Sequence, residues 1–234
     1  MISVCLPCFN GAPYIEAQLR SILASPLVDE VLVSDDGSTD GTPRVVEAIG
    51  DPRVQLLRGP QRGVVRNVES LLRRARGDLI FLADQDDVWL PRKVEVMAGA
   101  LVSADLAVSN CAVVDADLSP MYESFFAQRG SRPGLMANLW RNSYLGCCLA
   151  FRRSLLARAL PFPRHVPMHD WWLGLVAERW GTAVFIEEPL LLYRRHGGNA
   201  TPTLERFSAT RWQQLRWRWQ VSAALVRRHL SARP

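Results

Sequence analysis

Long apolar runs, a basic N-terminal segment and metal-site cysteine pairs are all absent from this sequence of 234 residues. Without a run of about 18 or more apolar residues, we expect no transmembrane helix. Residues 1–6 have the pattern of a strand rather than the basic start of a signal peptide. The five cysteines lack zinc-site spacing, and Cys5 and Cys8 fall in a predicted strand, whereas a redox thiolate is stabilised at a helix N-terminus. We therefore expect reduced, mostly buried thiols in a cytoplasmic protein.

Extreme composition is absent too. Apolar residues make up 48% of the chain and charged residues 22%, which excludes wholesale disorder. The formal net charge of +5 suits nucleotides, phosphorylated carriers or an anionic membrane surface, and it does not by itself indicate DNA. We expect no nucleic-acid partner. A nicotinamide enzyme is disfavoured, because no Gly-x-Gly-x-x-Gly follows the first predicted strand.

Strand and helix patterns alternate along the first half of the chain. Short apolar runs predict strands at 2–6, 30–34, 54–57, 79–83 and 106–109, with helical spacing between them. This alternation predicts an α/β fold in which helices flank a mostly parallel central sheet. The second half is less regular. It contains predicted strands at 147–151, 183–186 and 190–193, a helix at 171–180, and a loop-like stretch at 115–132.

Residues 204–230 have the spacing of an amphipathic helix. Its apolar positions are Phe207, Trp212, Leu215, Trp219, Ala223, Val226 and Leu230. Arginines flank this stripe, and two interpretations follow. The tryptophans and leucines pack on the rest of the chain or on a partner subunit in a homodimer. Alternatively, the helix lies on an anionic membrane surface, where a lipid-linked acceptor would be found.

Acidic residues follow two of the predicted strands. Asp84, Asp86 and Asp87 come directly after a buried strand, and such crowded carboxylates repel one another unless a cation lies among them. Their oxygens suit Mg²⁺ or Mn²⁺, although an acidic turn that caps the next helix is the alternative. Asp35 and Asp36 follow the second strand. A carboxylate there can bind a base or a ribose, or it can simply form a turn.

Taken together, these segments resemble family 2 glycosyltransferases of the GT-A fold. The resemblance is collinear over 4–10, 32–42, 63–67 and 77–87, and it resumes at 169–170 and 193–196. Residues 84–89 and 193–199 look most like the rhamnosyltransferase-type members. The family implies a nucleotide-binding half with a Rossmann-like sheet and a smaller acceptor-side half.

The resemblance also implies a role for each matching position. Nucleotide binding falls to Pro7, Phe9, Asn10, Asp35, Asp36, Arg66 and Asp84. Diphosphate contacts fall to Arg194, Arg195 and His196. A Mg²⁺ or Mn²⁺ ion would be held by Asp84, Asp86 and His196. Asp87 would only start the following helix.

The catalytic base implied by the resemblance is Asp170. Inverting transfer needs a carboxylate to take the proton of the acceptor hydroxyl. Many family members have Glu-Asp at this point, whereas this chain has His169 before Asp170. His169 would orient the acceptor or be structural. Without the resemblance, Asp170 could equally be a helix N-cap.

The resulting hypothesis is a metal-dependent, inverting glycosyltransferase of cell-surface polysaccharide synthesis. It would use dTDP-rhamnose or a UDP-sugar, and a glycan or lipid-linked saccharide as acceptor. We expect a catalytic domain at 1–203, divided into a nucleotide-binding half at 1–110 and an acceptor-binding half at 111–203, and the helix at 204–234. The protein would be cytoplasmic, or peripheral at the inner face of the membrane. The alternative is a non-catalytic nucleotide-sugar binder.

Overall fold

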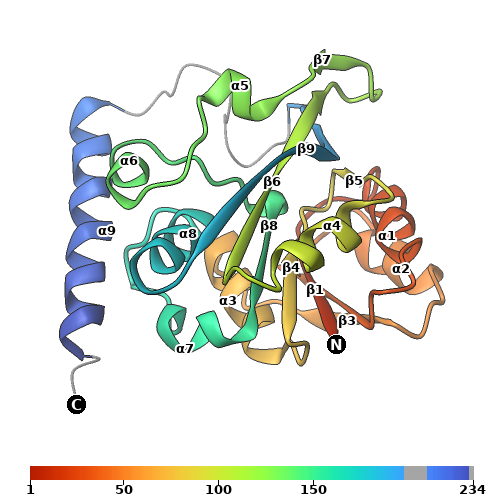
Figure 1. Cartoon of the computed structure of the whole chain (residues 1–234). Helices are drawn as coiled ribbons and strands as arrows, with labels where there is room; N and C mark the ends of the chain where they lie inside the picture. Colours follow the sequence, from red (N-terminus) through yellow and green to blue (C-terminus); the bar gives the residue numbers. More distant parts are fainter. Residues whose placement is uncertain (198–209, 232–234) are drawn as a thin grey trace.

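The computed structural model describes residues 1–197 and 210–231. In this part of the chain nine strands form one curled sheet, in the order β3-β2-β1-β4-β8-β6-β9-β5, with β7 beside β6 (Figure 1). Gly198, Asn199 and the predicted helix start at 204–209, including Phe207, lie outside the described residues.

The first half of the chain builds the parallel part of the sheet. Its elements are β1 (Ile2–Cys8), α1 (Ile15–Leu23), β2 (Glu30–Asp35), α2 (Thr42–Ala48), β3 (Val54–Arg58), α3 (Val64–Arg74) and β4 (Leu79–Leu82). β1 pairs with β2 and β4, and β2 pairs with β3, all in parallel. Every residue of β1 is buried, because helices cover the sheet and leave no solvent face.

The second half adds the remaining strands and helices. They are β5 (Val88–Trp89), α4 (Lys93–Ala100), β6 (Leu106–Val114), β7 (Pro120–Tyr122), α5 (Phe125–Arg129), α6 (Leu135–Trp140), η1 (Gly146–Cys148), β8 (Leu149–Arg152), η2 (Arg153–Leu155), α7 (Leu156–Ala159), α8 (His169–Trp180), β9 (Ala183–Arg194) and α9 (Arg211–Ser231). β8 lies antiparallel between β4 and β6, whereas β9 runs parallel to β6. The sheet is therefore parallel from β3 to β4 and mixed beyond β4.

Two expectations for the second half were wrong in detail. The two strands predicted on either side of Pro189 are one strand, β9. Its pairing with β6 shifts register near Asn110 and Pro189. Proline has no N–H to donate, so it is accommodated at a bulge rather than ending the strand. The Asn110 side chain donates to the Glu187 carbonyl at 3.0 Å beside this irregularity. The stretch predicted as a loop contains β7 and α5.

α9 packs against α6 along one side of the molecule (Figure 1). Val221 and Leu225 are buried, and Trp217 packs against the core. By contrast, Trp212 is 82% exposed and Trp219 68% exposed. The interpretation that Trp212, Leu215 and Trp219 pack on the chain itself was therefore wrong.

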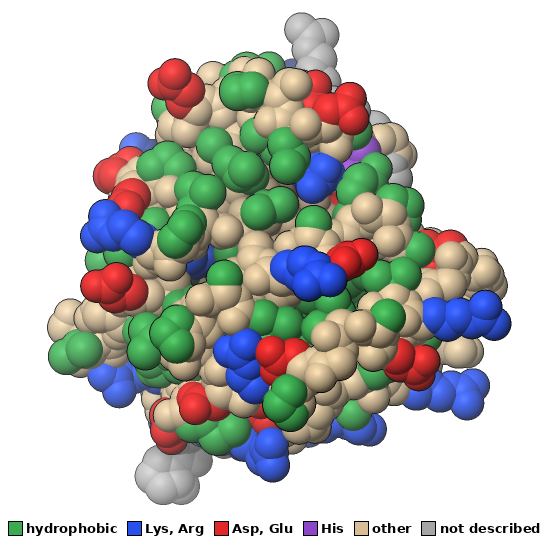
Figure 2. Space-filling view, turned by 90° about the vertical axis from the view of Figure 1, so that its right-hand side faces the viewer, with side chains coloured by type: hydrophobic (Ala, Val, Ile, Leu, Met, Phe, Trp, Pro, Cys, Tyr) green, Lys and Arg blue, Asp and Glu red, His purple; other side chains and the backbone are tan. Residues whose placement is uncertain are grey.

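The helix carries two apolar stripes, and the one that periodicity picked out faces away from the core. All five cysteines of the chain are free and buried. None of the described helices is long and apolar enough to span a membrane. On the face shown in Figure 2, side chains of both charges are interspersed with apolar ones.

Candidate functional site

A cavity of about 510 Å³ opens at the carboxyl ends of β1 and β4. Parallel strands deliver their following loops to this edge of a sheet. The lining residues are Pro7, Cys8, Phe9, Asp36, Gln61, Gly63, Val64, Asn67, Asp84, Gln85, Asp86, Leu145, Gly146, Met168, His169, Asp170 and Tyr193. Six predicted site residues are therefore brought together: Pro7, Phe9, Asp36, Asp84, Asp86 and Asp170.

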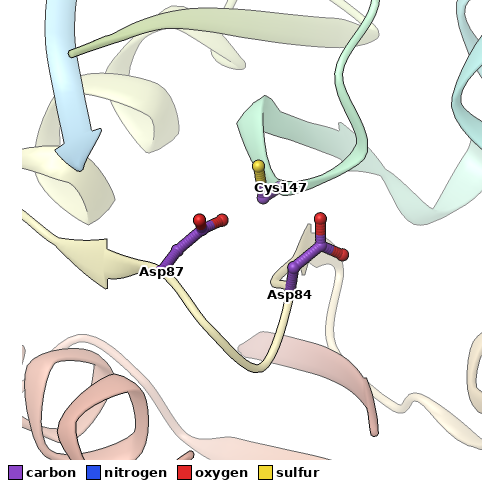
Figure 3. Close-up of side chains that lie close together, drawn as sticks. All are labelled: Asp84, Asp87 and Cys147. Carbon is purple, nitrogen blue, oxygen red and sulfur yellow. The ribbon is translucent and has the colours of Figure 1, made fainter. Parts of the chain in front are cut away.

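Of the three acids between β4 and β5, Asp84 and Asp86 line this cavity, and Asp87 is buried beside them. Asp84 and Asp87 point toward the Cys147 thiol (Figure 3), and donor atoms of the three lie within 4.8 Å of one another. Burial, and then the charge of Asp86, raise the pKa of Asp84 to about 7. Burial also raises the pKa of Asp87 well above its usual range, with Asp86 and Asp84 adding to the effect.

These carboxylates fit a divalent cation. Among the described residues, none donates a hydrogen bond to the buried Oδ2 of Asp87. Asp86 Oδ2 lies 2.8 Å from His196 Nε2, so an imidazole nitrogen adjoins the acids. The carboxylate oxygens suit Mg²⁺ or Mn²⁺. A cation here would remove the carboxylate repulsion that adds to burial in raising the pKa values of Asp84 and Asp87.

Asp87 does not start the following helix. The N-cap of α4 is Arg92, and Asp87 is fully buried. Its Oδ1 accepts a hydrogen bond from the Arg194 backbone N–H at 3.0 Å. Residues 83–87, between β4 and β5, form the acidic loop. Asp87 therefore joins the acidic loop to the end of β9. The sequence offered no signal for this long-range contact.

Asp170 lies in the first turn of α8 and lines the same cavity as Asp84 and Asp86. Its Oδ1 accepts a hydrogen bond from the Trp171 N–H at 2.5 Å. It is not the N-cap, which is Met168. Burial raises the pKa of Asp170 to about 7 despite this bond. His169 beside it is buried, and burial lowers its pKa to about 4, so its ring is neutral at pH 7.

Gln85 is a site residue that the sequence reasoning missed. Its Oε1 accepts from the Phe9 N–H at 2.9 Å, and its Nε2 donates to the Phe9 carbonyl at 3.1 Å. This pair of bonds fixes the end of β1 against the acidic loop. A Cβ on Gly11 would lie 2.3 Å from Gln85 Oε1, so only glycine permits the close approach. The hint in the sequence was Gly11, just after the first strand.

The acids after β2 have different partners. Asp36 accepts hydrogen bonds from the Gln61 N–H at 2.6 Å and the Gly63 N–H at 2.9 Å, and it lines the cavity. Asp35 accepts from the Ser38 N–H and hydroxyl, so it holds a turn and does not line the cavity. Asn10 is also outside the lining, and its Oδ1 accepts from the Thr39 N–H at 2.9 Å.

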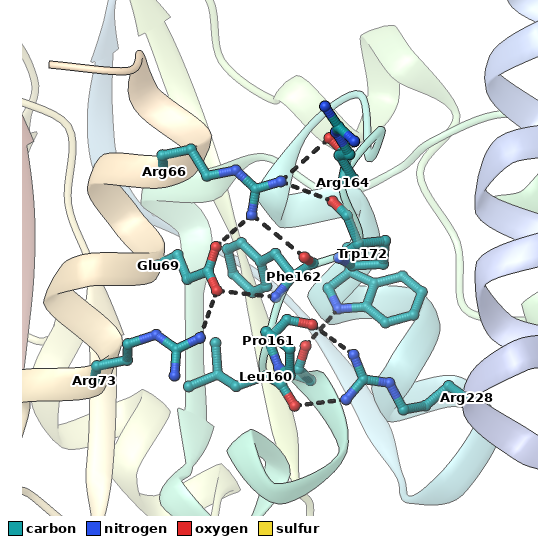
Figure 4. A network of polar contacts seen from close by, with 11 residues as sticks. Arg66, Glu69, Arg73, Leu160, Pro161, Phe162, Arg164, Trp172 and Arg228 are labelled. Atoms are coloured by element: carbon teal, nitrogen blue, oxygen red, sulfur yellow. Dashed lines mark hydrogen bonds and ion pairs between the residues drawn. The ribbon is translucent and has the colours of Figure 1, made fainter. Parts of the chain in front are cut away.

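The arginines predicted to meet the nucleotide have other partners in this structure. Arg66 pairs with Glu69 at 2.5 Å and donates to the carbonyls of residues 162, 163 and 164 (Figure 4). The Arg194 guanidinium donates to the Asp86 carbonyl at 2.8 Å and lies over the Tyr14 ring. Arg195 donates its backbone N–H to Val114. None of these three lines the cavity, as far as the described residues define it.

The sequence matches the model described as Glycosyl transferase family 2 over residues 3–160, more than half of the chain. The chain belongs to glycosyltransferase family 2. Solved structures agree with this assignment. S. aureus TarS 1-349 in complex with UDP-GlcNAc aligns with a TM-score of 0.68 at 17% identity, covering 99% of this chain and 73% of that one. The mannosyltransferase PcManGT from Pyrobaculum calidifontis, in complex with GDP-Man and Mn²⁺, aligns at 0.65 and 23% identity, covering 97% and 64%. The family 2 chain therefore has the GT-A fold.

Sequence relatives include two bacterial transferases. UDP-Glc:alpha-D-GlcNAc-diphosphoundecaprenol beta-1,3-glucosyltransferase WfgD of Escherichia coli is 22% identical over 99% of this family 2 chain and 88% of that protein. dTDP-rhamnosyl transferase RfbG of Shigella flexneri is 26% identical over 82% and 71%. Other matches are partial. The uncharacterized protein MT1568 of Mycobacterium tuberculosis is 38% identical over 42% of this chain, which spans 31% of that protein.

Proposed function

We propose that this chain transfers a sugar from a nucleoside diphosphate sugar to an acceptor hydroxyl, with inversion at the anomeric carbon. The observation that carries the proposal is that Asp84, Asp86 and Asp170 line one cavity at the ends of the parallel strands. A non-catalytic nucleotide-sugar binder is the alternative. Loss of the acids or of the base would favour it, and all three side chains are present.

The donor would lie in the cavity that the end of β1 and the acidic loop line together. Pro7, Phe9 and Asp36 line the side of the cavity where the nucleoside would bind. Asp84 and Asp86 would hold Mg²⁺ or Mn²⁺, with His196 next to Asp86. A bound cation would offset the negative charge that develops on the departing diphosphate. The complex of PcManGT with GDP-Man and Mn²⁺ supports a divalent cation together with a nucleotide sugar.

Asp170 would act as the base. A general base is most effective when its pKa is close to the working pH, and burial raises the pKa of Asp170 to about 7. As the acceptor oxygen attacks the anomeric carbon, the carboxylate takes its proton and the bond from carbon to the diphosphate oxygen breaks. His169, which is neutral at pH 7, would position the acceptor without adding a charge.

The donor would be dTDP-rhamnose or a UDP-sugar, in cell-surface polysaccharide synthesis. Two relatives support these donor classes, since RfbG is a dTDP-rhamnosyl transferase and WfgD is a UDP-Glc-dependent glucosyltransferase. Residues 1–110 would bind the donor and residues 111–203 the acceptor. Arg194 would position the acidic loop through its bond to the Asp86 carbonyl. A direct contact of Arg195 with the diphosphate stays a prediction.

We also propose that the outer stripe of α9 lies on an anionic membrane surface. Trp212, Leu215, Trp219, Val226 and Leu230 are exposed along it. Arg211, Arg216 and Arg227 are exposed on this helix, which has no acid, so its charge complements anionic headgroups. Co-sedimentation with anionic vesicles should be lost in a Trp212→Ser/Trp219→Ser variant and kept in Val102→Ser, an exposed apolar control. Equal binding by all three proteins contradicts the proposal, and concentration-dependent dimers without vesicle binding would assign the stripe to a homodimer.

A thermal-shift screen of nucleoside diphosphates and sugar nucleotides tests the transferase proposal. A ligand that binds only the folded state raises the melting temperature, and the rise grows with the logarithm of its concentration relative to its Kd. We expect the largest rise with the true donor, and a smaller one when Mn²⁺ is replaced by EDTA. If no nucleotide raises the melting temperature with either metal, the proposed function is wrong.

A further inference from the structure

A second cavity, of about 470 Å³, adjoins the first one. The two share Leu145, Met168 and Asp170 as lining residues. The second cavity is enclosed by α5, α6, the start of α8 and the inner side of α9. Resting on the transferase function proposed above, we propose that this second cavity binds the acceptor, and that the acceptor is a saccharide carrying a phosphate or diphosphate group.

The position of Asp170 supports the assignment to the acceptor. A base must reach the acceptor hydroxyl on one side while the anomeric carbon of the donor lies nearby on the other. Asp170 lines both cavities, so one carboxylate faces the donor space and the neighbouring space. A saccharide in the second cavity would therefore present its hydroxyl to the base.

Charge points to an anionic acceptor. Among the described lining residues, three are arginines, Arg129, Arg141 and Arg218, and Asp170 is the one acid. Burial lowers the pKa of Arg129, and the neighbouring Arg141 cation lowers it further. Arg141 and Arg218 form no ion pair with any described carboxylate. Cations gathered in this way are stabilised by a bound anion.

Aromatic side chains in the same cavity suit a sugar ring. Trp140, Trp171 and Trp217 line it, and the apolar C–H faces of a pyranose pack well on flat rings. Trp171 is held in place, because its Nε1–H donates to the Asn138 carbonyl at 2.8 Å. The Arg218 guanidinium lies 4.2 Å from the centre of the Trp140 ring and donates to the Trp140 carbonyl. Sugar-binding and anion-binding groups are therefore adjacent.

α9 completes this site rather than only covering the fold. Trp217 and Arg218 reach the cavity from its inner side. Farther along the same helix, Arg228 donates to the carbonyls of Leu160 and Pro161 and so anchors the helix (Figure 4). Three guanidinium groups carry more positive charge and more N–H donors than a single carboxylate can pair. A phosphate or diphosphate offers more negative charge and more acceptor oxygens. This difference favours phosphate over a uronic acid.

Binding measurements in EDTA test the inference. The probes are α-D-glucose 1-phosphate, D-glucuronic acid and D-glucose, which differ mainly in their charged group. We expect glucose 1-phosphate to bind about tenfold more tightly than the other two. Arg141→Ala should abolish this preference and Arg141→Lys should restore part of it, since lysine keeps the charge and loses the fork of donors. Arg132→Ala, an exposed arginine outside the cavity, is the matched control and should behave as the unmodified protein.

A glucosyl diphosphate with a decyl chain identifies the source of the phosphate. Tighter binding that depends on Trp212 and Trp219 indicates a lipid carrier, and no gain indicates a water-soluble phosphorylated acceptor. Equal affinity for glucose 1-phosphate and glucuronic acid, or a preference that survives Arg141→Ala, would overturn the inference. Nucleoside diphosphate binding with Mn²⁺ is measured on every variant. If nucleoside diphosphate binding is intact, a negative result with the phosphate probes contradicts the acceptor site alone. If the unmodified protein does not bind a nucleoside diphosphate, the transferase proposal is wrong.

Discussion

Replacing Asp170 by Asn should remove activity and, above neutral pH, stabilise the fold. Burial raises the pKa of Asp170 from 3.8 to about 7. Between these two values the folded protein holds a proton that the unfolded chain has released, so the free energy of unfolding falls as pH rises. The full difference is about 4 kcal/mol, at 1.36 kcal/mol for each pKa unit. Between about pH 5.5 and pH 8 the expected loss is about 2 kcal/mol.

Urea unfolding at both pH values measures this effect in EDTA. Asn has the same shape and no charge to bury, so Asp170→Asn should lose about 2 kcal/mol less than the unmodified protein over the interval. The charge of Asp170 also raises the pKa of Asp84, so relief of that repulsion adds to the difference. Asp117→Asn, at an exposed position, is the control and should follow the unmodified protein.

Activity gives the second half of this prediction. Without the carboxylate, transfer should fall by roughly 10² to 10⁴ while nucleotide affinity with Mn²⁺ is kept. The reasoning is refuted if the variant and the unmodified protein have the same pH dependence of unfolding. Full transfer by Asp170→Asn would show instead that another group is the base.

Two further predictions concern the walls of the site. Gly11→Ala should displace Gln85 and break its two bonds to Phe9, lowering donor affinity by about tenfold. Titration calorimetry on Gln85→Ala and on the double variant checks this, and fully additive losses would contradict it. Arg66→Ala should reduce the free energy of unfolding by about 1–3 kcal/mol, because Glu69 and three carbonyl groups lose a donor. The nucleotide affinity of this variant should be nearly unchanged. A large loss of affinity with unchanged stability would show that Arg66 binds the nucleotide.

The parts of the fold visible in the sequence were those set by local pattern. The buried strands β1, β2 and β4 have continuous apolar runs, and their acids follow at one edge of the sheet. For that reason the pattern alone placed Asp36 and Asp84 at one edge of the sheet, whereas Asp170, in the first turn of α8, could be assigned to the site only through the resemblance to the family. The mixed pairing of β8 could not be predicted, because strand direction depends on contacts between distant segments.

The direction of side chains was the other feature that the sequence could not predict. Arg66 lies in a segment that matches the family, yet it pairs with Glu69, one turn later, and points toward residues 162–164. α9 shows the same limit on a larger scale, since apolar residues lie on two of its faces. Periodicity picked out the stripe with Trp212 and Trp219, whereas the surface beneath the helix decides that Val221 and Leu225 are the buried residues.

The central claim is that the acidic loop holds a metal-bound nucleoside diphosphate. Titration calorimetry of the most stabilising nucleoside diphosphate, with Mn²⁺ and with EDTA, tests it most directly in the unmodified protein, Asp86→Ala and Asp170→Asn. We predict Mn²⁺-dependent binding that Asp86→Ala weakens by at least about tenfold and Asp170→Asn leaves unchanged. Binding that is equal with and without Mn²⁺, and equal in Asp86→Ala, would contradict the account.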